Sequence, residues 1–355
     1  MERVNKGFIS PSAAITIRSH QIRYYKYLDK APEVGDLVYG MVSRIGHHSS
    51  VENASGRIHV IHNGTKAVFV FGNRYAPDHY EGVVPERMKH EVDLLSRSGV
   101  VGIVKTKNAM IKDPTRIKIL GYVCDSNGAV LNTRSFPSIT PKQSQKKEPR
   151  ASMILVCGTS MNSGKTMAAV ACCWALASMG HDVRASKVTG TASLKDILHM
   201  NDAGANPYSD FTLLGYPSTY LLPEDEVLSI FNRLDLKYGN NQKNYWVVEF
   251  ADGINQRETS FLLSSSEVVS RIHKLIFCAT DAFGALGGLK ILEEEFGLVP
   301  DAISGVCSSS PLHVRELQKF TDSPVFNSAN LDLNQLATIL LPRERHTRTM
   351  RRSAA

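Results

Sequence analysis

A glycine-bounded loop that ends in Gly164-Lys165-Thr166 is the stretch of this sequence best suited to chemistry. It follows an apolar run that predicts a strand, and it opens an apolar-faced helix. In such a loop backbone N–H groups point at phosphate oxygens, and the helix N-terminus adds positive potential. We expect Lys165 to reach the β- and γ-phosphates of a nucleotide and the Thr166 hydroxyl to bind Mg²⁺. The predicted phosphate-binding residues are Gly158, Thr159, Asn162, Ser163, Gly164, Lys165 and Thr166.

The register of this loop departs from its common form, which places four residues between the first glycine and Gly-Lys-Thr. Here five residues lie between Gly158 and Gly164, so Thr159 takes the first position. This form resembles the dethiobiotin synthetase branch of P-loop proteins. That branch also includes cobyrinic-acid-type amide ligases and relatives of the nitrogenase iron protein. The resemblance covers roughly residues 151–330, and it implies ATP and Mg²⁺ as cofactors and a homodimer that forms next to the nucleotide site.

A second predicted strand ends at Lys187, and Thr189 and Thr191 follow it. Ligands of open α/β sheets bind at the carboxyl ends of the strands. In dethiobiotin synthetases a lysine at this place faces the phosphates and the substrate carboxylate. The resemblance therefore implies a catalytic role for Lys187 and a substrate loop with Thr189 and Thr191. The alternative for Lys187 is a surface lysine at a strand end.

An apolar run over residues 245–250 predicts a strand that carries Glu249 and Asp252 to its end. The related enzymes hold Mg²⁺ through an acidic residue here, and hard cations prefer carboxylate oxygens. We assign Glu249 to the metal and Asp252 to positioning a nucleophile or accepting its proton. The alternative for Asp252 is a turn residue before a glycine. Arg257 follows, either as a bidentate ligand of an anionic substrate or as a surface residue at a helix start.

Two further segments supply candidate ligands. The loop after a late strand often recognises the nucleotide base in the related fold, which assigns Ser308 and Ser309 to the nucleotide; the alternative is capping of a helix that begins at Pro311. Arg74 lies in a polar and aromatic loop, where it faces either a substrate or the partner domain, or belongs to an ordered turn. We expect the small-residue segment 280–288 to be a flexible loop that covers the substrate.

A metal site on the histidines of the N-terminal half is not expected. His59 and His62 differ by three positions along a predicted strand, so their side chains point to opposite faces. No cysteine or cluster of carboxylates accompanies these two residues, or the neighbouring His47 and His48, to complete a ligand set.

The phosphate-loop half also resembles a poorly characterised P-loop family, some of whose members are D-glutamate N-acetyltransferases. The phrases that carry this resemblance are Ser186–Thr191, Asp202–Gly204, Ser218–Pro223 and Ala251–Gly253. One branch of that family holds the phosphates of acetyl-CoA in its phosphate loop and cleaves no ATP. A phosphate loop indicates phosphate binding more securely than hydrolysis.

The chain divides into segments of different composition. We expect a basic β-rich, barrel-like domain over residues 1–136, a linker over 137–150, an α/β domain over 151–341 and a basic disordered tail over 342–355. Alternating strands and helices in the third segment predict a mostly parallel P-loop sheet with helices on both faces. Within the first segment, Asn63-Gly64 predicts a hairpin turn, and 86–96 has helical spacing.

The distribution of charge along the chain indicates which kinds of partner the protein binds. The chain has 41 Lys and Arg against 34 Asp and Glu, a net charge of +7. Residues 1–140 carry a net +7 and residues 151–341 a net −7, so linker and tail supply the whole excess. This pattern favours two modules that dock on each other over a nucleic-acid-binding surface. No apolar run is long enough to cross a membrane, and the first residues lack the apolar core of a signal peptide, which predicts a cytoplasmic protein without a membrane partner.

Three functions remain open on this basis. The first is ATP- and Mg²⁺-dependent phosphoryl transfer to a small-molecule acid, by a kinase or a ligase. The second is CoA-dependent N-acylation of an amino acid, with acetyl-CoA as cofactor. The third is a nucleotide-gated protein whose basic β-rich module binds nucleic acid.

Overall fold

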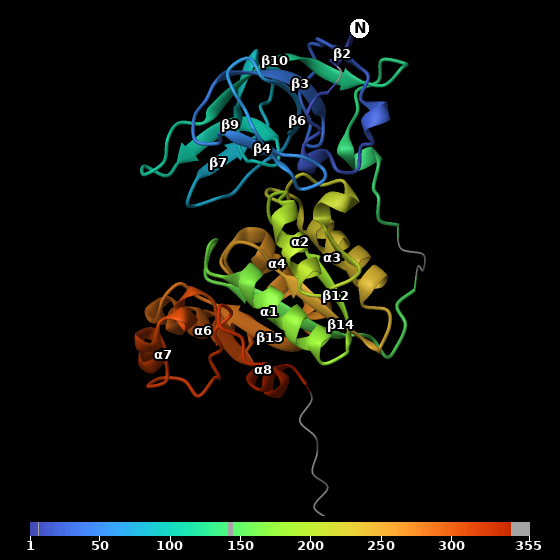
Figure 1. The fold of residues 1–355 in the computed structure, drawn as a ribbon. Coiled ribbons are helices and arrows are strands. Elements are labelled where there is room, and N and C mark those ends of the chain that lie inside the picture. The colour runs from blue at the N-terminus through green and yellow to red at the C-terminus, as the bar shows by residue number, and fades with distance from the viewer. Residues whose placement is uncertain (6, 141–144, 342–355) are drawn as a thin grey trace, which may run out of the picture.

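The computed structural model describes residues 1–5, 7–140 and 145–341. It holds two large sheets, one in each predicted module, and the two modules lie against each other (Figure 1). Residues 342–355, predicted to be a disordered tail, lie outside the described residues. Within the described ranges no helix is long and apolar enough to span a membrane.

The N-terminal module is built almost entirely of strands. They are β1 (Glu2–Arg3), β2 (Tyr24–Lys26), β3 (Leu37–Arg44), β4 (Ser50–Glu52), β5 (Ile58–Val60), β6 (Lys66–Phe71), β7 (Tyr80–Val83), β8 (Glu91–Leu94), β9 (Val100–Lys107) and β10 (Thr115–Cys124). Strands β3, β6, β9, β8 and β10 pair in that order, and β10 pairs again with β3, so the five strands close on themselves. Each contributes to one buried cluster that includes Val38, Phe69, Val92, Val101 and Ile117. The barrel-like expectation therefore matches the observed topology.

Two local predictions in this module are wrong. Residues 86–96 form no helix: β8 pairs with β9 and β10, because closing the ring requires a strand there and Val92 and Leu94 both point into the core. Asn63-Gly64 joins no hairpin, since β5 pairs with β4 whereas β6 pairs with β3 and β9. Ile58 and Val60 of β5 are exposed, so they give β6 no apolar face to pair against.

The C-terminal module alternates strands and helices. The strands are β11 (Ser152–Gly158), β12 (Asp182–Lys187), β13 (Tyr208–Asp210), β14 (Asn244–Glu249), β15 (Ile272–Cys278) and β16 (Ala302–Ser304). The helices are α1 (Lys165–Ser178), α2 (Leu194–Asp202), α3 (Glu224–Tyr238), α4 (Arg257–Ser264), α5 (Ser266–Val269), α6 (Ala282–Phe296), α7 (Pro311–Leu317) and α8 (Leu333–Leu340). The strand order is β13-β12-β14-β11-β15-β16, and every pairing is parallel.

Helices cover both faces of this sheet, which confirms the predicted fold class. One apolar core joins the sheet to α1, α2 and α8, and the other joins it to α3, α4 and α6. The segment 280–288 is not the flexible loop that was expected. Asp281 caps α6 by accepting a hydrogen bond from the Gly284 backbone at 2.7 Å, and Gly288 packs on the Phe277 ring. Its small residues therefore serve close packing of a helix on the sheet.

Direct hydrogen bonds join the two modules, and in those described below the acceptor is a carboxylate of the barrel module. Asn162 of the phosphate loop donates to Asp78 at 2.6 Å, and Tyr220 donates to Glu81 at 2.9 Å. The Leu194 backbone N–H, at the start of α2, donates to the buried carboxylate of Glu52 at 3.1 Å. A side chain of the barrel module therefore caps a helix of the other module.

Replacing Glu52 with alanine is expected to lower the free energy of unfolding by about 0.5–2 kcal/mol, because α2 loses its capping acceptor and the buried Ser12 hydroxyl loses the carboxylate to which it donates. Urea denaturation followed by circular dichroism measures the change. Glu86→Ala removes an exposed carboxylate of the same module and serves as the control. Equal stability of the two variants would show that the cap contributes nothing.

Candidate functional site

The predicted phosphate loop joins β11 to α1, and its backbone is held tightly. Gly164 precedes α1 in the left-handed conformation, with φ at 95°. A Cβ there would lie 2.7 Å from the Cα of Gly305, so neither conformation nor space favours another residue. Asn162 also has a positive φ, at 60°. The loop therefore presents the N-terminus of α1 in the geometry that binds phosphate.

Lys165 begins α1 and its side chain folds back over the loop. Its Nζ lies 2.6 Å from the Ser160 carbonyl oxygen and 3.5 Å from Ser163 Oγ. Burial lowers the pKa of Lys165 from its ordinary value, while the nearby carboxylates of Glu249 and Asp252 oppose that shift. The ammonium group is thus fixed where phosphate oxygens of a bound nucleotide would complete its hydrogen bonds.

Thr166 and Glu249 form an oxygen-rich pair beside this loop. The Thr166 hydroxyl donates to Glu249 Oε1 at 3.2 Å. Glu249 Oε2 is buried and has no hydrogen-bond partner among the described residues. A hydroxyl and a carboxylate with an unused oxygen are the donors that Mg²⁺ prefers, so the residues present fit the metal that phosphate loops employ.

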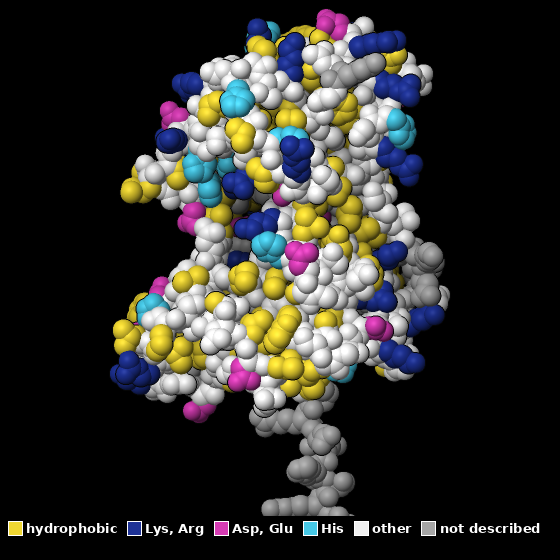
Figure 2. Space-filling model, in the orientation of Figure 1, with side chains coloured by type: hydrophobic (Ala, Val, Ile, Leu, Met, Phe, Trp, Pro, Cys, Tyr) yellow, Lys and Arg dark blue, Asp and Glu magenta, His cyan; other side chains and the backbone are white. Residues whose placement is uncertain are grey.

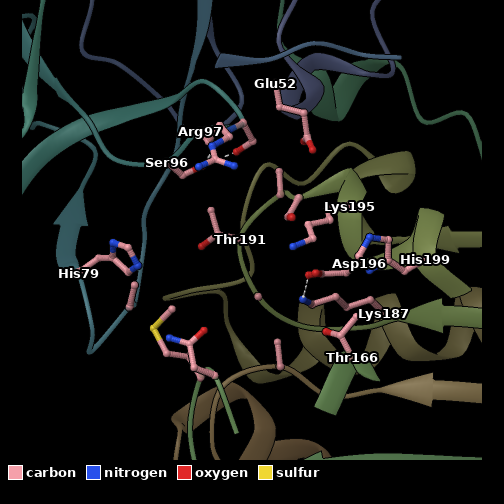
Figure 3. A pocket seen from close by; sticks show the side chains of 18 of the residues that line it. Glu52, His79, Ser96, Arg97, Thr166, Lys187, Thr191, Lys195, Asp196 and His199 are labelled. Atoms are coloured by element: carbon pink, nitrogen blue, oxygen red, sulfur yellow. Dashed lines mark hydrogen bonds and ion pairs between the residues drawn. The ribbon is translucent and has the colours of Figure 1, made fainter. Parts of the chain in front are cut away.

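Lys187 lies at the end of β12 between two carboxylates. Its Nζ is bound to Asp196 (Figure 3). The same nitrogen lies 3.4 Å from Glu249 Oε1. Burial opposes the charged form, but Asp196 and Glu249 outweigh burial and hold the pKa of Lys187 above its ordinary value. Only 8% of the residue is exposed, which contradicts the surface-lysine alternative.

Asp252 lies just beyond β14 with a strained backbone, at φ 60°. Burial raises the pKa of its carboxyl group to about 6, although Lys165, Lys187 and Arg74 act in the opposite direction. A carboxylate that titrates close to neutral pH is suited to accepting a proton. Asp252 also serves the turn that was its alternative role, since the next residue, Gly253, packs against the Thr159 carbonyl.

Asp252→Asn is expected to be more stable than the native protein above pH 7, by about 1–3 kcal/mol. The folded-state pKa near 6 exceeds the ordinary value near 3.9, so the favourable contribution of Asp252 is complete below about pH 4 and is lost as pH rises through 6. Asparagine tolerates positive φ and does not ionise. Thermal melting at pH 4 and pH 8 measures the difference, with the exposed Asp322→Asn as control. A gap that fails to widen with pH would contradict the shift.

A cavity of about 1190 Å³ lies between the modules, and the phosphate loop forms part of its wall. Figure 2 shows the hollow with lysine, arginine and histidine side chains around it. Arg74, Lys165, Thr166, Lys187, Glu249, Asp252 and Thr191 all line it. The fold therefore gathers predicted residues from both modules around one space.

Arg74 reaches this cavity from the barrel module and is almost completely buried. It donates through NH1 to the Leu95 carbonyl oxygen, and the same nitrogen lies 3.0 Å from His48 Nε2. Burial lowers the pKa of Arg74 to about 10, and Asp252 partly offsets this. The guanidinium stays charged at neutral pH, so its assignment to an anionic substrate remains a prediction that the geometry allows.

Four of the predicted residues outside the phosphate loop do not line the cavity, and neither do Gly158, Thr159 and Ser163 of the loop itself. Thr189 Oγ accepts from the Ala251 backbone at 2.9 Å, and Arg257 donates to the Leu222 carbonyl oxygen at 2.7 Å. Ser308 donates to the Gly305 carbonyl oxygen at 2.6 Å. Ser309, the fourth, is exposed and precedes Ser310, whose side chain caps α7. Local backbone bonding occupies three of these side chains. Arg257 lies at the start of α4, which was its alternative role, whereas the cap of α7 is Ser310 and neither Ser308 nor Ser309.

Several cavity residues escaped the sequence analysis. Asp196 and Lys195 lie in the first turn of α2, where only their place after the Thr191 loop pointed to the site. His79 lies beside His47 and His48 in the structure, although it is distant from both in the sequence. Burial, followed by the charge of Arg74, lowers the pKa of His48 to about 2 and of His79 to about 4. Arg97 faces the same space from the barrel (Figure 3).

The parallel sheet, the loop after β11 and the oxygen pair beside it define a P-loop fold.

No family model matches the chain, and no curated protein matches it. Among solved structures the chain is similar to the signal recognition particle receptor FtsY from Elizabethkingia anophelis in complex with GDP, with 11% identity, a TM-score of 0.36, and coverage of 59% of this chain and 70% of that one. It is also similar to chloroplast FtsY from Physcomitrella patens, with 13% identity, a TM-score of 0.35, and coverage of 58% and 70%. Scores of this size bear on neither ligand nor reaction, and the resemblance to dethiobiotin synthetases stays a prediction.

Proposed function

We propose that this protein is an ATP- and Mg²⁺-dependent phosphoryl-transfer enzyme that activates a small anionic acceptor, such as a carboxylate. The observation that carries the proposal is the grouping of Lys165, Thr166, Glu249 and Lys187 at the ends of adjacent parallel strands, on one wall of a cavity. Positioning and charge stabilisation are what phosphoryl transfer requires of a protein.

Each residue has a distinct part in this proposal. Lys165 and the N-terminus of α1 bind the phosphates, and Thr166 and Glu249 hold Mg²⁺. When bound, the ion neutralises charge on the phosphate oxygens. Lys187 is fixed by Asp196 and Glu249, and orients the acceptor next to the phosphate loop. Asp252 takes a proton from the acceptor or from a second nucleophile.

The size of the cavity supports a second ligand. Cavities that hold one small molecule measure about 300–1,000 Å³, and this one measures about 1190 Å³. Phosphate-binding residues come from the C-terminal module, and Arg74 comes from the barrel. A nucleotide and an anionic acceptor therefore fit together, with cations available to both.

Thermal-shift measurements with ATP, GTP and acetyl-CoA, each with and without Mg²⁺, test the proposal. A ligand that binds only the folded protein raises its melting temperature, and at a given concentration the rise grows with the logarithm of its affinity. We expect ATP with Mg²⁺ to give the largest shift. Stabilisation by acetyl-CoA without Mg²⁺, and none by ATP, would replace phosphoryl transfer with N-acylation of an amino acid. ADP release in the presence of candidate carboxylates then identifies the acceptor.

A further inference from the structure

Three histidine rings meet on the barrel side of the cavity. His47 Nε2 lies 2.8 Å from His79 Nδ1. One ring nitrogen from each of His47, His48 and His79 can be chosen so that all three lie within 4.8 Å of one another. A tetrahedral ion with nitrogen ligands at about 2.0–2.1 Å needs those nitrogens roughly 3.3 Å apart. The observed separations, 2.8 Å for one pair and up to 4.8 Å for the set, lie on either side of that spacing.

The backbone that carries these rings is fixed by the fold. Thr115 Oγ donates to the His48 carbonyl oxygen at 2.6 Å and accepts from the Gly46 backbone at 2.8 Å. The His47 backbone donates to the Asp113 carbonyl oxygen at 2.8 Å, and His79 donates to Ala76 at the same distance. Because the segments are already ordered, binding an ion costs little conformational entropy.

We propose that His47, His48 and His79 form a binding site for a transition-metal ion of the Zn²⁺ type. Imidazole nitrogens suit zinc, copper, nickel and iron, whereas Mg²⁺ takes oxygen ligands such as those of Thr166 and Glu249. Three protein ligands leave a fourth position open, as in catalytic zinc sites. All three histidines line the cavity, so that position opens onto the space that also contains Lys165.

Arg74 determines which kind of ligand can occupy the fourth coordination position of the ion. Its NH1 lies 3.0 Å from His48 Nε2, and the Leu95 carbonyl oxygen lies 3.0 Å from the same nitrogen, so an ion that takes this nitrogen replaces both contacts and has a guanidinium close by. Two positive charges at this range repel unless an anion lies between them. The fourth ligand is therefore an anion, such as hydroxide or a carboxylate, which Arg74 binds from its other side. Metal binding at this site does not depend on what the phosphate loop binds.

Cobalt binding to the untagged full-length protein, with excess Mg²⁺ present, tests the site. We expect the native protein to take up one equivalent of Co²⁺ with visible d–d absorption, and His47→Ala/His79→Ala to lose that equivalent. His62→Ala removes an exposed histidine of the same module and should bind as the native protein does. Near-ultraviolet circular dichroism checks that each variant is folded. No uptake by the native protein, or equal uptake by the double variant, overturns the proposal.

A second titration tests the anionic ligand. Added acetate should tighten Co²⁺ binding to the native protein, and Arg74→Gln should largely remove that dependence. An affinity that ignores acetate in the native protein overturns the role given to Arg74.

Discussion

Lys165→Ala is expected to abolish nucleotide binding and to lower the rate of the proposed reaction by at least about a hundredfold. The ammonium group is the buried cation that the loop itself holds in place, through Ser160 and Ser163. Without it, the phosphate loop itself would offer the phosphates only backbone dipoles and uncharged side chains. Thermal shift with ATP and Mg²⁺ reports the loss of binding, and ADP release reports the loss of rate.

The control for this variant is Lys290→Ala, which removes an exposed lysine of α6 whose ion-pair partner, Glu294, lies on the same helix. Both variants should show the native circular dichroism spectrum. A folded Lys165→Ala protein that keeps its ATP-dependent stabilisation and turnover would remove the basis of the proposed function.

Glu249→Gln is expected to lower the rate of the proposed reaction by a similar factor. It should also remove the dependence of ATP-induced stabilisation on Mg²⁺ concentration. Glutamine keeps the shape of the side chain and has one weaker oxygen donor, whereas the metal needs carboxylate charge. The same change frees Lys187 from one of its two anionic neighbours. The measurement is ATP-dependent stabilisation over a Mg²⁺ titration.

Glu294→Gln, an exposed carboxylate on α6, provides the matched control. Two results separate metal binding from simple destabilisation: the melting temperature without ligand, and the response to ATP alone. If Glu249→Gln responds to Mg²⁺ as the native protein does, Glu249 is not a metal ligand.

The parts of the site that the sequence predicted are those that one short segment determines. The phosphate loop is contiguous, and its chemistry follows from Gly164, Lys165 and Thr166. Glu249 followed from a rule about strand ends, because parallel strands bring their carboxyl ends to one edge. The parallel sheet followed from the alternation of apolar strands and helices.

The parts that were missed depend on contacts between distant segments. His79 contacts His47 only in the closed barrel, and the spacing of the two residues in the sequence does not predict that contact. The apolar residues of 86–96 have helical spacing. The segment is nevertheless extended over β8, because the ring of strands closes through the pairing of β8 with β9 and β10. Arg257 lies near Asp252 in sequence, but the first turn of α4 directs it to the Leu222 carbonyl oxygen. Tertiary contacts overrode local preference in each case.

The carboxylate of Glu52 that caps α2 has a consequence for how the protein is made. The ribosome releases the barrel first, and N-terminal domains fold as units during synthesis. When residues 194–202 emerge, the surface that receives them already holds the acceptor for their first N–H group. Formation of α2 then brings Asp196 onto Lys187. In that order of synthesis, the acceptor that caps α2 precedes the helix, and the contact of Asp196 with Lys187 forms after the phosphate loop has been synthesised.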